Sequence, residues 1–112
     1  MGAREEVFDV VRKIPHGMVL SYGQVADMLS GGALSARMVG QIMAQAPGGV
    51  PWHRVVAQDG TLVIAKRDPA MAARQRRLLE AEGVTFDQIG RVNMERHCWY
   101  TAAGMGSLFD DI

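Results

Sequence analysis

The sequence predicts an α+β domain that is mostly helical, with a winged-helix-like helix-turn-helix and a short β-hairpin wing. Three observations predict this class. Apolar residues recur at helical spacing in four segments, two short helices are joined by a Gly-containing turn, and Asp59-Gly60 separates two short β-branched runs. A chain of 112 residues can bury one modest core, so a single domain is expected.

The first half of the chain predicts three helices. The first covers about residues 4–14 and stops at Pro15. The second begins at Ser21, three residues before Gln24 in a capping-box arrangement, and ends at Gly31-Gly32. The third begins near Ser35 and is the second helix of the predicted helix-turn-helix, whose N-terminal residues would face DNA.

The second half predicts two short strands and a long helix. Val55-Val56 and Thr61–Ile64 are the expected strands of the hairpin. Asp68-Pro69 combines an N-cap residue with Pro at the first helical position, so a helix is expected from there to about Glu82. Residues 84–94 are expected to be irregular or a weak pair of strands.

The charges are balanced overall and unevenly placed. Twelve basic and twelve acidic residues exclude a generic polycation that coats nucleic acid. Between Ser35 and Arg77, however, the sequence contains seven basic residues and two acidic ones, which gives this segment a net charge of +5. This middle segment predicts a phosphate-contacting face. The alternative is a solvated helix surface, above all for Arg74, Arg76 and Arg77.

Composition also bears on location. No apolar run is long enough to span a bilayer, and the first residues contain no apolar signal region. The single cysteine, Cys98, excludes an internal disulfide and fits a reducing compartment. A cytoplasmic location is therefore expected, or a nuclear one in a eukaryote. His97 has no spacing to another ligand that indicates a metal, and no cofactor is expected.

The stretch from Val50 to Val56 carries the strongest functional signal. Trp52, His53 and Arg54 bring an aromatic, an imidazole and a guanidinium to the mouth of a core strand, which suits a nucleobase pocket. The alternative is a core aromatic beside a surface charge. Residues 51–56, Pro-Trp-His-Arg-Val-Val, resemble the Pro-Cys-His-Arg-Val motif of the O6-alkylguanine-DNA alkyltransferases, with Trp52 in place of the alkyl-accepting Cys. That replacement marks the alkyltransferase-like proteins.

Three further motifs of the same family occur in the family's order. They are similar to residues 14–26, Ile-Pro-His-Gly-Met-Val-Leu-Ser-Tyr-Gly-Gln-Val-Ala, residues 35–40, Ser-Ala-Arg-Met-Val-Gly, and residues 78–84, Leu-Leu-Glu-Ala-Glu-Gly-Val. The resemblance implies the fold of the alkyltransferase C-terminal domain for residues 1–100, followed by a flexible tail at 101–112.

The resemblance also implies roles for individual residues. Tyr22 would press on the phosphate beside the target nucleotide, and Arg37 would fill the gap left in the base stack. The expected DNA-binding set is completed by Ser35, Ala36, Met38 and Gly40. The expected lesion pocket consists of Val50, Pro51, Trp52, His53 and Arg67. His53 and Glu82 would be the remnant of the relay that activates the missing thiolate.

The implied function is a non-enzymatic sensor of O6-alkylguanine in duplex DNA. It would dock a helix-turn-helix in the minor groove, flip the damaged nucleotide and direct it to nucleotide excision repair proteins, acting as a monomer away from membranes. No alkyl transfer is expected because an indole lacks the nucleophilicity of a thiolate. One alternative is a winged-helix regulator without lesion specificity, and another is a residual enzyme that uses Cys98.

Overall fold

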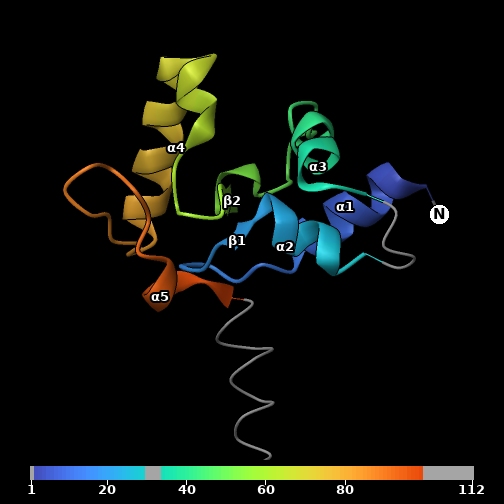
Figure 1. Cartoon of the computed structure of the whole chain (residues 1–112), viewed down its shortest axis with the longest axis horizontal. Coiled ribbons are helices and arrows are strands. Elements are labelled where there is room, and N and C mark those ends of the chain that lie inside the picture. The colour runs from blue at the N-terminus through green and yellow to red at the C-terminus, as the bar shows by residue number, and fades with distance from the viewer. Residues whose placement is uncertain (1, 30–33, 100–112) are drawn as a thin grey trace, which may run out of the picture.

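The computed structural model of the chain describes residues 2–29 and 34–99. Five α-helices, two short 3-10 helices and two strands make up this part of the chain (Figure 1). In chain order they are α1 (Ala3–Arg12), β1 (Leu20–Ser21), α2 (Tyr22–Asp27), α3 (Ala36–Met43), η1 (Trp52–Arg54), β2 (Val55–Val56), η2 (Val63–Lys66), α4 (Pro69–Ala81) and α5 (Met94–His97). The predicted class, a mostly helical α+β domain with a helix-turn-helix, is confirmed.

Three predicted helix starts are confirmed by their caps. The side chains of Ser21, Ser35 and Asp68 each accept a hydrogen bond from the backbone N–H three residues later, at 3.1–3.2 Å. At Ser21 the Gln24 side chain also accepts the Ser21 N–H at 2.9 Å, which completes the capping box. The helix ends at Asp27, before the predicted stop at Gly31-Gly32, which lies outside the described residues.

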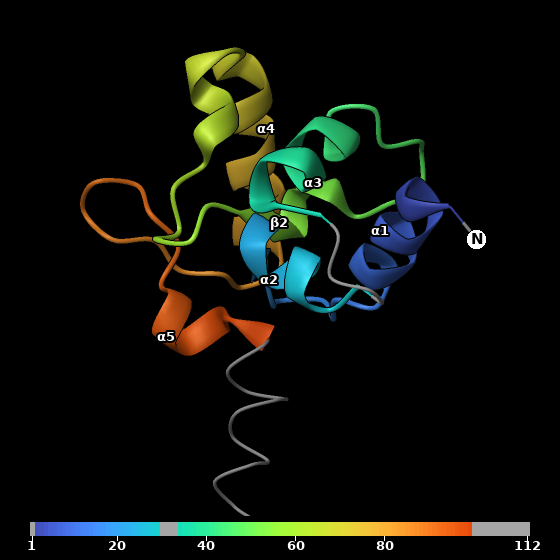
Figure 2. The ribbon, with the colours of Figure 1, turned by 45° about the vertical axis from the view of Figure 1, so that its right-hand side comes forward.

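The two strands form a small parallel sheet between two cores. Leu20 pairs with Val55, and both side chains pack against α1, α2 and α3. Because neighbouring residues of a strand point to opposite faces, Val19 and Val56 instead enter the second core, with Leu79 of α4. Figures 1 and 2 show the strands lying between α4 on one side and α2 and α3 on the other. The sheet thus joins the half of the molecule built from α1, α2 and α3 to the half that α4 covers.

The predicted hairpin wing is wrong. A turn does form at Asp59-Gly60, where Gly60 has φ +89°, but residues 61–64 are not a strand, and η2 begins at Val63. Across the turn the N–H of Ala57 donates to the carbonyl of Thr61 at 3.0 Å, but β2 pairs with β1, and the carbonyl of Gly60 accepts the N–H of Val92 at 2.9 Å. The chain after Leu62 therefore satisfies its backbone groups locally, in η2. Tertiary pairing overrides the β propensity of the run.

The close approach at Gly60 makes a stability prediction. A methyl group at this position would overlap the carbonyl oxygen of Val92, and the positive φ is unfavourable for any L side chain. We expect Gly60→Ala to lower the free energy of unfolding by about 2 kcal/mol. Gly48→Ala is the matched control, because nothing lies within 4 Å of its added methyl group. The measurement is urea denaturation monitored by circular dichroism. Equal urea midpoints for the two variants would contradict this prediction.

The segment after α4 closes the second core. Phe86 and Val92 form an isolated antiparallel bridge, which agrees with the weak strand pair expected in residues 84–94. The short helix α5 was not predicted, although Asn93 caps it by accepting the N–H of Arg96 at 3.2 Å. Cys98 follows and is buried, with its Sγ donating to Gln24 at 3.3 Å. The predicted tail at 101–112 lies outside the described residues.

Among the helices that the structure describes, none combines the length and apolar character needed to cross a membrane.

Candidate functional site

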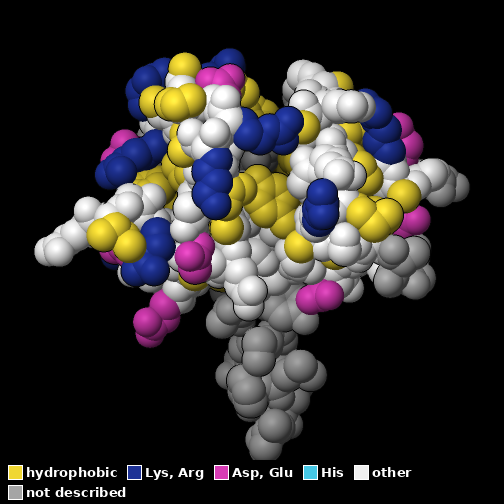
Figure 3. Space-filling view, turned by 45° about the horizontal axis from the view of Figure 1, so that its top comes forward, with side chains coloured by type: hydrophobic (Ala, Val, Ile, Leu, Met, Phe, Trp, Pro, Cys, Tyr) yellow, Lys and Arg dark blue, Asp and Glu magenta, His cyan; other side chains and the backbone are white. Residues whose placement is uncertain are grey.

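A cavity of about 540 Å³ opens between the α3 side of the molecule and the side formed by η2 and α4. In the space-filling view, hydrophobic side chains form its hollowed centre, and Lys and Arg side chains stand on both sides (Figure 3). It is lined by Tyr22, Ala36, Arg37, Gly40, Gln41, Met43, Ala44, Trp52, Val63, Ile64, Arg67 and Gln75. Its lining is thus apolar with a few polar groups, which is typical of a small-molecule or base pocket.

The α3 side of the cavity carries a phenol and a guanidinium. Tyr22 is half-buried, and this burial raises the pKa of its hydroxyl, so the group is a protonated donor at neutral pH. Arg37 is exposed in the first turn of α3. Neither side chain makes a hydrogen bond or ion pair within residues 2–29 and 34–99, so both are available to a ligand.

Trp52 forms a wall of the cavity because the backbone turns sharply at this point. After Pro51 the chain enters η1, in which the N–H of Trp52 donates to the carbonyl of Val50 at 2.7 Å. The indole packs partly against the first core and meets the His53 ring edge-to-face, with centroids 6.2 Å apart and planes at 83°. One part of the ring is held by protein while another lines the cavity.

The turn that carries Trp52 is anchored on Glu82, just after α4. Glu82 Oε2 lies 2.7 Å from His53 Nε2 and accepts from the Arg54 guanidinium at 2.8 Å, while Oε1 accepts the N–H of Gly17 at 2.8 Å. A second arm of Arg54 donates to the carbonyl of Ile14 at 2.9 Å. Arg54 is therefore an internal brace between Glu82 and the carbonyl of Ile14. His53 and Glu82, the pair that the resemblance implies as a relay remnant, are in contact and form part of this structural hub.

The electrostatics of the hub favour the carboxylate form of Glu82. Burial raises the pKa of this carboxyl group, but hydrogen bonds from Arg54, Gly17 and His53 outweigh that effect. The net result is a pKa of about 2, against an ordinary value of 4.5. The side chain of Glu82 is only 9% exposed, so its charge depends on these donors.

The basic residues of the middle segment divide into two groups. Arg54 is bound to Glu82, and Arg76 pairs with Glu80 at 3.4 Å and lies over the Phe86 ring at 4.5 Å. The guanidinium groups of these two arginines therefore already have protein partners. No hydrogen bond or ion pair holds the remaining five cations within the described ranges; they are Arg37, Lys66, Arg67, Arg74 and Arg77.

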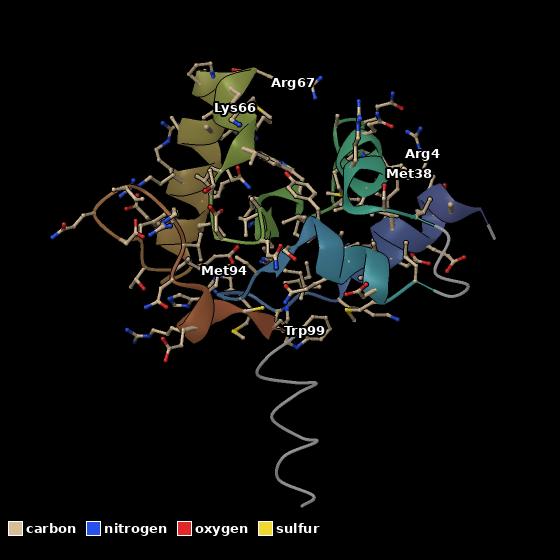
Figure 4. All side chains as sticks on the ribbon, in the orientation of Figure 1. Arg4, Met38, Lys66, Arg67, Met94 and Trp99 are labelled. Atoms are coloured by element: carbon tan, nitrogen blue, oxygen red, sulfur yellow. The ribbon has the colours of Figure 1, made fainter. Side chains whose placement is uncertain are left out.

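Of the predicted DNA-binding and pocket residues, the cavity brings together Tyr22, Ala36, Arg37, Gly40, Trp52 and Arg67. Figure 4 shows Arg67 reaching from the η2–α4 side toward α3.

The other predicted site residues lie outside this lining. Ser35 caps α3, Met38 is 42% exposed, and Val50 is buried in the first core. Pro51 precedes the η1 turn, and His53 faces Glu82. None of these residues is among those that line the cavity, and the places of Val50, Pro51 and His53 in the lesion pocket stay predictions.

Sequence reasoning missed several lining residues. On α3, Gln41 and Ala44 follow Arg37 at intervals of four and seven residues, so helical spacing could have placed them on the same face. Gln75 of α4 gave no such signal, because it is a polar residue in an apolar position, only 3% exposed. Its side-chain Nε2 donates to the carbonyls of His53 and Val55 at 3.2 and 3.0 Å, which ties α4 to the Trp52 turn.

Comparisons with known proteins agree with this geometry. Residues 2–84 match the family described as 6-O-methylguanine DNA methyltransferase, DNA binding domain. The DNA base-flipping protein of Escherichia coli K12 is 39% identical over 97 residues, covering 85% of this chain and 72% of that protein. Alkyltransferase-like protein 1 of Schizosaccharomyces pombe is 40% identical over 101 residues, covering 84% and 91%.

A solved structure adds a spatial comparison. The crystal structure of Schizosaccharomyces pombe Atl1 in complex with damaged DNA containing O6-carboxymethylguanine matches with a TM-score of 0.71 and 36% identity, covering 86% of this chain and 93% of that one. The O6-methylguanine methyltransferase of Mycobacterium tuberculosis matches with a TM-score of 0.61 and 31% identity, and this chain covers 48% of its length.

Proposed function

The chain belongs to the alkyltransferase-like proteins of the 6-O-methylguanine DNA methyltransferase DNA-binding-domain family, and from this membership we propose that it recognises O6-alkylguanine in duplex DNA by flipping the damaged nucleotide into the cavity. The observation that carries the proposal is the cavity itself, which brings Tyr22, Arg37, Trp52 and Arg67 to one opening. Its volume of about 540 Å³ lies in the range of pockets that bind small molecules.

Each of these side chains suits one step of recognition. The Tyr22 hydroxyl is a protonated donor that can bind the phosphate beside the target. Arg37 has a planar cation that can stack where the base has left, which offsets part of the few kcal/mol that extrusion costs. The Trp52 indole offers an apolar wall to the alkyl group, whose burial contributes about 0.8 kcal/mol per CH₂. Arg67 can donate to acceptors on the base edge.

The same site lacks the means to remove the alkyl group. Trp52 stands where the alkyltransferase motif has its nucleophilic Cys, and an indole does not accept an alkyl group as a thiolate does. Cys98 is buried, its thiol donates a hydrogen bond to Gln24, and it does not line the cavity. Because the lesion would persist after binding, we propose that the bound protein passes it to nucleotide excision repair.

The mode of docking follows from the helix that faces the cavity. On α3 the small residues Ala36 and Gly40 flank Arg37, which allows a close approach of the helix to a narrow groove. We therefore propose that α3 docks in the minor groove. We also propose that the protein acts as a monomer, in the cytoplasm or in a nucleus. Lys66, Arg74 and Arg77, which have no hydrogen bond or ion pair to any described residue, would supply phosphate contacts, and such contacts make affinity salt-dependent.

The test is binding to matched duplexes that contain either guanine or O6-methylguanine, at one fixed salt concentration. We expect at least tenfold tighter binding to the lesion duplex, about 1.4 kcal/mol. The alkyl group, carried as a radiolabel, should remain on the DNA after long incubation. Equal affinity for the two duplexes would rule out lesion recognition. Sequence-selective binding to undamaged DNA would instead identify a winged-helix regulator, and label on the protein would identify an enzyme.

A further inference from the structure

We infer that Arg4 of α1 binds a phosphate of the DNA strand opposite the lesion, so that the protein holds both strands of the duplex. This inference rests on the proposed function and deepens it, because it assigns a contact to the strand from which no nucleotide is flipped. Arg4 is exposed in the first turn of α1, outside the basic middle segment of the chain. A cation is unfavourable in the first turn of a helix, so helix stability does not account for this arginine.

Three uncharged groups hold the Arg4 guanidinium in place. Nη1 donates to Oε1 of Gln45 at 2.9 Å, and Nη2 donates to the backbone carbonyl of Gln45 at 3.4 Å. The guanidinium also lies over the Phe8 ring, 5.5 Å from the ring centroid. These contacts restrain the side chain without neutralising its charge, and the two hydrogen bonds use only two of its five N–H groups. A phosphate can therefore bind the remaining N–H groups at a small cost in side-chain entropy.

The position of Arg4 relative to α3 is the basis for assigning the strand. Figures 1 and 2 show α1 on one side of α3 and α4 on the other side. In Figure 4, Arg4 accordingly lies on the opposite side of α3 from Lys66 and Arg67. Gln45, which anchors Arg4, directly follows the C-cap of α3, so the guanidinium flanks this helix.

A helix docked in the minor groove has one DNA strand on each side. The groove is only about 6 Å wide, so the phosphates of both strands lie beside such a helix. The cavity opens between α3 and the side formed by η2 and α4, so the strand on that side is the one whose nucleotide can enter the cavity. The strand on the other side of α3, next to Arg4, is then the undamaged strand. Cations on both sides of α3 thus suit a duplex that is held by both of its backbones.

The first test is the salt dependence of binding to the O6-methylguanine duplex. It is measured for wild type, Arg4→Ala and Arg12→Ala. Arg12→Ala is the matched control, because it removes the same charge from the same helix, but Arg12 already pairs with Asp9 at 3.1 Å. We expect the slope of log K against log salt concentration to become less negative by about 0.9 in Arg4→Ala, and to keep its wild-type value in Arg12→Ala. An unchanged slope in Arg4→Ala would overturn the inference.

The second test identifies the strand with methylphosphonate linkages, which carry no charge. They are placed one at a time in either strand around the lesion. At the contacted position of the undamaged strand, the linkage should weaken binding by wild type about fivefold, the upper end for an exposed ion pair, and should have no effect on Arg4→Ala. Linkages in the damaged strand should weaken binding by both proteins equally. If the two proteins differed for the damaged strand instead, the strand assignment would be wrong.

Gln45→Ala separates a phosphate contact from a purely structural role of Arg4. This variant loses the side-chain anchor of Nη1 but keeps the guanidinium, so its salt slope should equal that of wild type. If Arg4 only tied α1 to the end of α3, Arg4→Ala and Gln45→Ala would lose the same affinity with wild-type slopes, and the inference would fail. Failure of the proposed function is recognised separately, because wild type would then bind O6-methylguanine and guanine duplexes equally.

Discussion

Replacing Glu82 by glutamine is expected to lower the free energy of unfolding by about 3 kcal/mol, the typical effect of removing one partner of a buried ion pair. Glutamine preserves the shape of the side chain but leaves the Arg54 guanidinium, 16% exposed, without its counter-charge. The change would also weaken the bonds that tie the Trp52 turn to α4 and to the Gly17 turn. Urea denaturation at neutral pH would measure the effect.

Glu80→Gln is the matched control, because it makes the same chemical change two residues earlier. Glu80 pairs with Arg76 at the surface, where the two side chains are 51% and 45% exposed. Such exposed pairs contribute at most about 1 kcal/mol. Similar losses in the two variants would show that Glu82 holds no special place in the structure.

Acid should remove the difference between wild type and Glu82→Gln. The pKa of Glu82 is lower in the folded protein, about 2, than its ordinary value of 4.5, so ionised Glu82 stabilises the fold. That contribution is fully present above about pH 4.5 and is lost as the pH falls toward 2. Asp59 and Asp87, whose pKa values are also lowered by hydrogen bonds from Thr61 and Arg91, are the same in both proteins. A stability difference that stays constant down to pH 2.5 would contradict this account.

The parts of the fold that were predictable depend on local chemistry. The caps at Ser21, Ser35 and Asp68 were found because side chain and backbone meet within three residues. The wing was wrongly predicted because β2 pairs with β1 and Gly60 bonds to Val92, and both partners lie far away in the sequence. Local propensity does not indicate such long-range pairing.

The candidate site shows the same division. Family motifs led to Tyr22, Arg37, Trp52 and Arg67, and the cavity does contain all four. They also paired His53 with Glu82, a contact across 29 residues that no local pattern could indicate. Gln75 was missed for a related reason: a buried glutamine on a helix has meaning only once its two carbonyl partners, some 20 residues away, are known.

Arg37→Ala is expected to weaken binding to an O6-methylguanine duplex by about one to two orders of magnitude, since stacking on a base or in its gap is worth about 1–3 kcal/mol. Binding to the undamaged duplex should weaken much less. Arg77→Ala is the matched control, because it removes an exposed arginine that has no hydrogen bond or ion pair in the described part of the chain and does not line the cavity. This variant should lose only a phosphate contact, so its affinity for both duplexes should fall by the same factor. If Arg37→Ala lowered the affinity for both duplexes equally, Arg37 would be a phosphate ligand and not a residue that stacks in the gap.

Trp52→Ala should abolish the preference for the lesion while retaining binding to DNA, because the wall against which the alkyl group packs is removed and the cations are not. Trp99→Ala is the control for the general effect of losing a tryptophan. Trp99 also packs against the first core, but it lies far from Arg67 and does not line the cavity (Figure 4). Both variants should lose stability, and only Trp52→Ala should bind lesion and guanine duplexes alike. If Trp99→Ala lost the preference as well, the effect would come from the core and not from the cavity wall.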